Sequence, residues 1–244
     1  MHLSKISLAL RQWGATGFSP LSLFASGEQG AWYDPSDLST MFQDSAGTTP
    51  VTTDGQSVGK ILDKSGRGNH ASQATAAARP LYKTDGTYHW LQFDGVDDGL
   101  STAATTFGAG NFNSVYGMKR ATVGNDVVAF SGSGVYFALT ATGNSSLAFG
   151  TVGSTIRHFV NSVEIGTINA TTRDEMHLAT PATQKKVLTI KDFLASSFNP
   201  LQFGNYGGSY TFEGSLFSYI MADGMTPAEI AQTEAWVNSK TGAY

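Results

Sequence analysis

The sequence lacks cysteine altogether, which excludes a disulfide framework, thiolate metal ligands and a cysteine nucleophile. Charged residues make up only 14%, with a formal net charge of −4, so the basic surface of a nucleic-acid-binding protein is missing. No apolar run approaches the roughly 18 residues of a membrane span. The N-terminus has neither the uninterrupted apolar stretch nor the cleavage site of a signal peptide, because Arg11 breaks its apolar segment.

Glycine is abundant, with 28 residues, and serine and threonine are frequent, a composition that favours short strands and tight turns. Short strand candidates follow one another at close spacing, as in a sandwich or jelly roll. The length of 244 residues fits one large β domain. We expect strands at residues 31–34, 58–62, 91–93, 112–119, 125–130, 134–140, 145–151, 155–160, 163–168, 174–180, 185–191, 201–204 and 212–221.

The chain ends in a predicted helix at residues 226–240. Thr226-Pro-Ala-Glu229 has the pattern of a capping box with proline in the first turn, and Gly242 follows as a stop signal.

The first residues also show helical spacing. Leu3, Ile6, Leu10 and Trp13 recur at this spacing, and Ser19-Pro20 introduces a second apolar segment with Leu23 and Phe24. One interpretation is a helix packed on its own domain. The other is an arm over residues 1–27 that docks on a neighbouring subunit of an oligomer, with residues 28–244 forming the domain.

Four segments in order resemble the concanavalin A-like lectin/glucanase superfamily, especially its laminin-G-like members. They are Ala31-Trp-Tyr-Asp34, Asp63-Lys-Ser-Gly-Arg-Gly-Asn69, Leu91-Gln-Phe-Asp-Gly-Val-Asp-Asp98, and Phe212-Glu-Gly214 with the following 225–230. The resemblance implies an all-β, concanavalin A-like jelly-roll sandwich, which here would carry an N-terminal helical arm and a short C-terminal helix.

A finer resemblance connects residues 27–40, and Ala78-Arg-Pro80, with virion proteins of tailed bacteriophages. It implies a structural or host-contact role in a particle that is made in the host cytoplasm and released by lysis, without a signal peptide. The arm would then bind other virion proteins, and repeated copies favour a homo-oligomer.

Catalytic patterns are missing from the sequence. Glucanases of this superfamily place carboxylates in alternation on one strand, which points them into a shared cleft. The glutamates here are scattered, and the five histidines show no metal-ligand spacing. We therefore expect no catalytic residues and no enzyme.

Asp94, Asp97 and Asp98 form the one cluster of hard oxygen ligands, near Asp63 and Asn69 in the family's arrangement. Calcium is the one cofactor that such a cluster would suit. The favoured alternative is that these side chains form Asx turns and cap the backbone, so that no cofactor is needed.

Sugar binding needs exposed aromatic rings together with amides. Tyr136, Asn205, Tyr206 and Tyr210 are the candidates, because glycines around residues 204–208 leave room for a ligand. A glycine-rich hairpin whose tyrosines cover the sandwich edge is the alternative.

Taken together, the sequence predicts a non-enzymatic bacteriophage virion protein with a lectin-like domain for contacts with host-surface polysaccharide or the particle surface. The alternatives are a head or tail decoration protein without a ligand, and a divergent glycan hydrolase.

Overall fold

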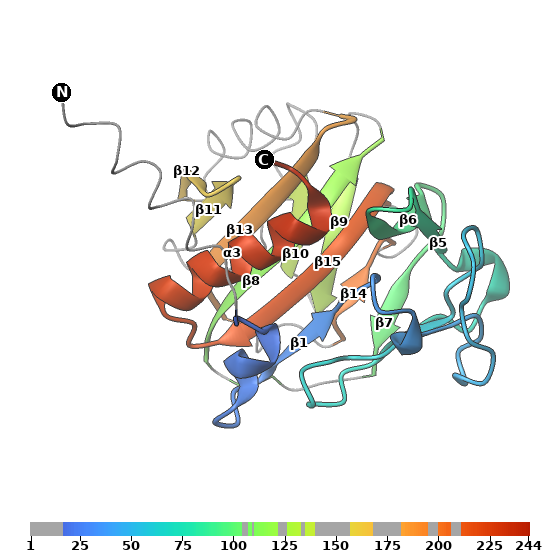
Figure 1. The fold of residues 1–244 in the computed structure, drawn as a ribbon, viewed down its shortest axis with the longest axis horizontal. Coiled ribbons are helices and arrows are strands. Elements are labelled where there is room, and N and C mark those ends of the chain that lie inside the picture. Colours follow the sequence, from blue (N-terminus) through green and yellow to red (C-terminus); the bar gives the residue numbers. More distant parts are fainter. Residues whose placement is uncertain are drawn as a thin grey trace.

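The computed structural model describes residues 17–103, 107–108, 110–121, 126–132, 135–139, 157–167, 182–194, 200–205 and 211–244, with the backbone alone for 126–132, 135–139, 166–167 and 194. Within these residues two antiparallel β-sheets face each other, and an α-helix lies across the outside of the larger sheet (Figure 1). The predicted all-β jelly-roll sandwich with a C-terminal helix is therefore confirmed. The predicted N-terminal helix lies outside the described residues.

In the described part of the chain the larger sheet has eight strands, in the order β12-β11-β13-β8-β15-β6-β5, with β1 paired to β15. β1 and β6 share one edge of β15, because β1 pairs with residues 219–222 of that strand and β6 with residues 213–216. The strands are β1 Gly30–Tyr33, β5 Leu81–Thr84, β6 His89–Asp94, β8 Asn111–Arg120, β11 Arg157–Val160, β12 Val163–Thr167, β13 Lys185–Leu194 and β15 Glu213–Asp223.

The smaller sheet has seven described strands, in the order β10-β9-β14-β7-β4-β3-β2. They are β2 Met41–Phe42, β3 Lys60–Ile61, β4 Ala71–Ser72, β7 Leu100–Thr102, β9 Asp126–Gly132, β10 Val135–Leu139 and β14 Gln202–Phe203. The sequence does not predict β2, β4, β5 or β7, because such short strands show almost no alternation of apolar and polar residues. The strands expected at 145–151 and 174–180 lie outside the described residues.

Aromatic side chains fill the space between the sheets. The ring of Phe203 from the smaller sheet lies 5.2 Å from that of Tyr33 and 5.3 Å from that of Tyr219, both edge to face. Tyr116 packs on Tyr219 with 6.0 Å between ring centroids. Burial raises the pKa of all three tyrosines, so their phenol groups stay neutral in the core.

A second apolar cluster forms between the larger sheet and α3 (Pro227–Thr241), whose capping box is present as predicted. Ile230 and Val237 of α3 pack there on strand residues such as Val187 and Ile220. The other described helices are short 3-10 turns: η1 Pro20–Phe24, η2 Leu38–Thr40 and η3 Ala76–Ala78.

Two residues of the predicted arm belong to this second cluster. Leu23 and Phe24 of η1 are buried in it beside Trp32, and so pack within the domain. Leu3, Ile6, Leu10 and Trp13 lie outside the described residues, and the arm remains a prediction that rests on them.

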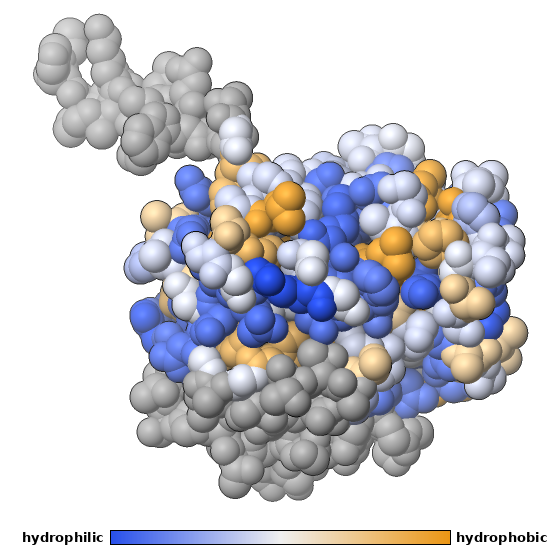
Figure 2. Space-filling view, turned by 90° about the horizontal axis from the view of Figure 1, so that it is seen from below, coloured by the Kyte–Doolittle hydropathy of each residue, from blue (hydrophilic) through white to orange (hydrophobic). Residues whose placement is uncertain are grey.

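The surface of the described residues carries its large exposed apolar side chains singly. Figure 2 shows one face on which hydrophobic residues form small separate groups among hydrophilic ones. None of the described helices has the length and apolar character needed to span a membrane. The large apolar side chains exposed to solvent are Leu21, Leu81, Val96, Val163 and Tyr244.

A buried carboxylate connects the two sheets. Asp63 follows β3 and accepts hydrogen bonds from the backbone N–H groups of Trp32 (2.9 Å), Ser65 (2.9 Å) and Asn69 (3.0 Å), and from the Ser65 hydroxyl (2.7 Å). The Asn69 side-chain amide donates in turn to the carbonyl of Gly30 at 2.6 Å. A buried carboxylate is stable only with such donors, so this turn is held firmly against β1.

Asp63→Asn should lower the free energy of unfolding by about 2–4 kcal/mol, because the new amide NH₂ would meet donors where the carboxylate now accepts. Chemical denaturation measures the loss. The matched control is Asp54→Asn, whose carboxylate is exposed and bonded to Lys83 and the Thr84 N–H, and which should cost less than about 1 kcal/mol. Equal losses in the two variants would contradict the special role of Asp63.

Candidate functional site

A polar pocket lies on the outer face of the smaller sheet. Three cross-strand neighbours form its floor: Ser72 of β4 pairs with Ser101 of β7, which pairs with Gln202 of β14. They point outward because the residues beside them in these strands, such as Ala71 and Phe203, are buried in the core. The pocket has a volume of about 250 Å³, and its lining is completed by Gln73, Asp97, Gly99, Leu100 and Asn205.

Amide side chains hold the wall of this pocket. Asn205 Nδ2 donates to the carbonyl of Asp97 at 3.3 Å, and Gln73 Nε2 donates to the carbonyl of Gly99 at 3.1 Å. Both bonds fix the loop between β6 and β7, which carries the acidic residues. The pocket thus combines hydroxyl, amide and carboxylate groups, the set that hydrogen-bonds a polyhydroxylated ligand.

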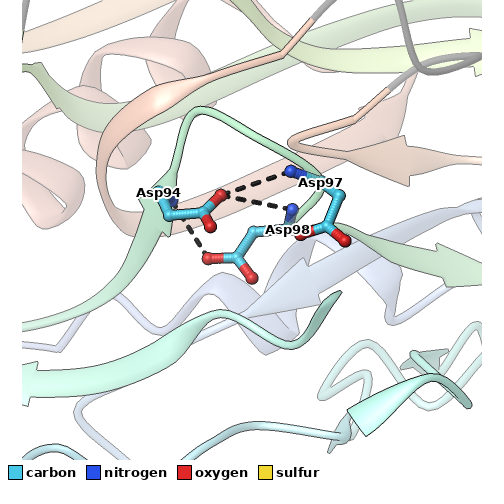
Figure 3. Close-up of side chains that lie close together, drawn as sticks. All are labelled: Asp94, Asp97 and Asp98. Atoms are coloured by element: carbon cyan, nitrogen blue, oxygen red, sulfur yellow. Dashed lines mark hydrogen bonds between the residues drawn. The ribbon is translucent and has the colours of Figure 1, made fainter. Parts of the chain in front are cut away.

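The loop between β6 and β7 folds around its own carboxylates (Figure 3). Asp94 Oδ1 accepts from the N–H groups of Val96 (2.8 Å), Asp97 (3.4 Å) and Asp98 (3.4 Å), while Asp98 Oδ2 accepts from the N–H of Asp94 (3.0 Å). Gly95 has a φ of +77° and could not carry a side chain, because a Cβ would lie 2.7 Å from Glu213. The bonds expected of Asx turns are therefore present.

The pKa of one carboxyl in this loop, that of Asp98, is raised, which favours its protonated form. Asp98 is buried, with 7% of its surface exposed, and burial raises its pKa to about 6, with a further contribution from the negative charges of Asp94 and Asp97. A carboxyl with such a pKa can hold a proton near neutral pH and donate it, as a general acid does. Asp97, by contrast, is exposed and lines the pocket.

The three carboxylates are also a possible ligand set for a hard cation. One oxygen from each of Asp94, Asp97 and Asp98 lies within 4.8 Å of the others. Oxygen donors of this kind suit calcium. Since Asp94 and Asp98 already accept backbone hydrogen bonds, the loop has a structural use for them without a metal, and calcium binding remains a prediction.

The structure brings together only some of the sugar-binding candidates. Asn205 lies in the pocket wall beside Asp97. Tyr206 and Tyr210 lie outside the described residues, and Tyr136 lies in β10, where the backbone alone is described. The sequence did not indicate the pocket residues Ser72, Gln73, Ser101 and Gln202, because each is a single polar residue in or beside a very short strand.

No protein-family model matches the chain, and the comparison with curated proteins finds no match. Solved structures share the fold. A GH54 α-L-arabinofuranosidase soaked with a cyclic sulfate inhibitor is 14% identical, with a TM-score of 0.50, over 91% of this chain and 66% of its own. An arabinofuranosidase complexed with arabinofuranosyl-α-1,2-xylobiose is 13% identical, with a TM-score of 0.50, over 91% of this chain and 65% of its own. The chain thus spans slightly less than two thirds of these proteins.

These findings correct the expectation of a non-enzymatic bacteriophage virion protein. The solved structures that share this fold are glycosidases, and nothing in the comparisons supports a virion role. The expectation rested on the absence from the sequence of carboxylates alternating along one strand. The acidic cluster noted in the sequence, Asp94, Asp97 and Asp98, lies at the end of β6 and in the loop after it, and Asp97 of this cluster lines the polar pocket.

The raised pKa of Asp98 predicts a pH dependence of stability. Protonation of Asp98 stabilises the folded protein relative to the unfolded chain. This contribution is fully present below pH 3.8, the pKa of the unfolded carboxyl, and is lost as the pH rises through about 6, the pKa in the folded protein. Asp98→Asn keeps an oxygen to accept from the Asp94 N–H and removes the charge. Above pH 6 this variant should therefore exceed the wild type in free energy of unfolding, by something on the order of 1–3 kcal/mol, as measured by denaturation at several pH values.

Asp44→Asn is the control with the opposite sign. Hydrogen bonds from the Thr48 and Thr49 N–H groups lower the pKa of Asp44, so its stabilising effect is present at neutral pH and lost on acidification. That variant should be less stable than the wild type at pH 7. An Asp98→Asn variant that is destabilised at pH 7 in the same way would contradict the assignment.

Proposed function

We propose that this chain is a carbohydrate-active domain that binds a sugar in the polar pocket and hydrolyses its glycosidic bond. One observation carries the proposal: a pocket of hydroxyl and amide groups lies beside a loop in which one carboxyl is exposed to the pocket and its neighbour has a pKa raised to about 6. The fold shared with arabinofuranosidases supports it at the level of architecture.

Glycoside hydrolysis needs one carboxyl as acid and one carboxylate as nucleophile or base. Asp98 lies beside the pocket-lining Asp97 and is not itself part of the lining. We infer that it takes the role of the acid, since its raised pKa lets it hold and release a proton near neutral pH. Asp97 takes the second role, since its carboxylate reaches the pocket. An oxygen of Asp97 and one of Asp98 lie within 4.8 Å of each other, so both carboxyls are close enough to act at one bond.

The pocket floor supplies the binding contacts. Ser72, Ser101 and Gln202 present two hydroxyls and an amide in one row across three strands. A sugar ring on this floor would exchange hydrogen bonds with these groups, and Asn205 keeps the Asp97 wall in place.

The test is release of 4-nitrophenol from a panel of 4-nitrophenyl glycosides that includes the α-L-arabinofuranoside. Asp97→Asn and Asp98→Asn should each lower kcat/KM at least about a hundredfold, because a proton-transfer group or nucleophile contributes on that scale. Asp44→Asn, a turn carboxylate outside the pocket, should leave the rate unchanged. An inactive wild type, or full activity in both Asp97→Asn and Asp98→Asn, would refute hydrolysis at this site.

Binding is measured separately by calorimetry with the sugar that supports hydrolysis. Gln202→Ala should weaken binding roughly three- to tenfold, the effect of one lost hydrogen bond. An unchanged affinity in this variant would place the sugar elsewhere.

A further inference from the structure

A polar row crosses the outer face of the larger sheet. Residues directly opposite one another on β13, β8, β15 and β6 are Lys185, Lys119, Ser215 and Gln92. Facing side chains in such a row lie about 5 Å apart at Cβ. The row is ordered, because Gln92 Oε1 accepts from the Ser215 hydroxyl at 3.0 Å.

This row lies just beyond the C-terminal end of α3. The next pair on this face, two residues farther along β13 and β8, is Val187 and Gly117. Val187 packs in the apolar cluster under α3, and a Cβ on Gly117 would lie 1.8 Å from Thr241 Oγ1. Lys185 and Lys119 therefore share the sheet face that α3 covers, and they lie one step along their strands beyond the last helix contact. The polar pocket lies on the opposite side of the sandwich, on the outer face of the other sheet.

Aromatic rings border the row. The Lys185 ammonium lies 3.5 Å from the centroid of the half-buried Tyr88 ring and 5.1 Å from that of Phe217. Trp90, also half-buried, packs on Phe217 with 5.6 Å between centroids, and its Nε1 donates to Gln92 Oε1 at 3.1 Å. We call Tyr88, Trp90, Gln92, Lys119, Lys185, Ser215 and Phe217 the lysine–aromatic face.

The two lysines of this face have no ion-pair partner among the described residues. Like charges directly opposite in a sheet destabilise it, yet neither Lys119 nor Lys185 makes an ion pair within that part of the chain. The Asp85 carboxylate attracts the Lys185 ammonium without forming an ion pair with it, and also accepts hydrogen bonds from the N–H groups of Thr87 and Tyr88. The C-terminal end of α3 offers about half a negative charge, which leaves an excess of positive charge.

We propose that the lysine–aromatic face binds an acidic polysaccharide through the carboxylates of its uronic acid units. The lysine pair supplies charge complementarity to a carboxylate, Trp90 and Tyr88 supply apolar ring surface for a sugar, and Ser215 and Gln92 supply hydrogen-bonding groups. The chain as a whole carries a net charge of −4, so attraction of a polyanion must come from this local feature. The site extends the proposed function by a second contact with the polymer.

The experiment measures affinity of the full chain for polygalacturonate and for its methyl ester, which has the same backbone without the charge. The wild type should bind the free acid saturably and the ester at least tenfold more weakly. Lys119→Gln with Lys185→Gln should lower affinity for the free acid at least tenfold. The control is Lys60→Gln with Lys191→Gln, which changes the net charge equally and should bind as the wild type does. Lys60 lies on the smaller sheet, and Lys191 lies six residues along β13 from Lys185, about 20 Å away.

Absence of saturable binding by the wild type would overturn the proposal, as would equal affinity for the ester or equal loss in the control pair. Thermal melting confirms that each variant is folded, and Trp90→Phe, which keeps an apolar ring, should retain most of the affinity. The outcome is independent of hydrolysis in the pocket: the lysine variants should keep the wild-type rate on 4-nitrophenyl glycosides, and Gln202→Ala should keep the affinity for polygalacturonate.

Discussion

The fold depends on one buried carboxylate. Asp63 accepts hydrogen bonds from Trp32 on β1 of the larger sheet and from the turn that follows β3 of the smaller sheet. Because a carboxylate without donors cannot be buried at reasonable cost, the turn and β1 have to meet at this point. The same turn ends at β4, which places Ser72 in the pocket floor. A contact in the interior of the sandwich therefore sets the position of a group on its outer surface.

Trp32 extends this connection to a third layer. Its backbone N–H binds Asp63, while its ring packs edge to face on Trp236 of α3, with 5.6 Å between centroids. Lys64, next to Asp63 in the chain, lies over the Trp32 ring and pairs with Asp34 at 3.3 Å. The helix is thus fixed over the middle of the larger sheet. The lysine–aromatic face lies on the larger sheet beyond the end of this helix, and the polar pocket lies on the smaller sheet, whose described strands the helix does not contact.

Sequence patterns predicted the features whose chemistry is local. The capping box at Thr226 and Glu229 and the Asx turn at Asp94 involve residues two or three apart, so their bonds follow from the sequence. The pocket floor could not be predicted, because Ser72 and Gln202 are far apart in the chain and meet only through strand register. The same holds for Lys119 and Lys185. The expectation of a non-enzymatic protein is contradicted by the solved structures that share the fold, which are glycosidases, and no local pattern in the sequence pointed to them.

The backbone of Asp98 packs closely against Gly204, which lies between the pocket residues Gln202 and Asn205 in the chain. Gly204 ends β14 with a φ of +87°, and a Cβ there would lie 2.3 Å from the Asp98 carbonyl and 2.5 Å from the Phe93 ring. A side chain at this position would displace the acidic loop, and Asp98 would become exposed. The pKa of Asp98 would then move toward its ordinary value, because burial is its largest cause. The neighbouring Asn205 holds Asp97 in the pocket wall, so the segment after β14 contacts both Asp98 and the wall of the polar pocket.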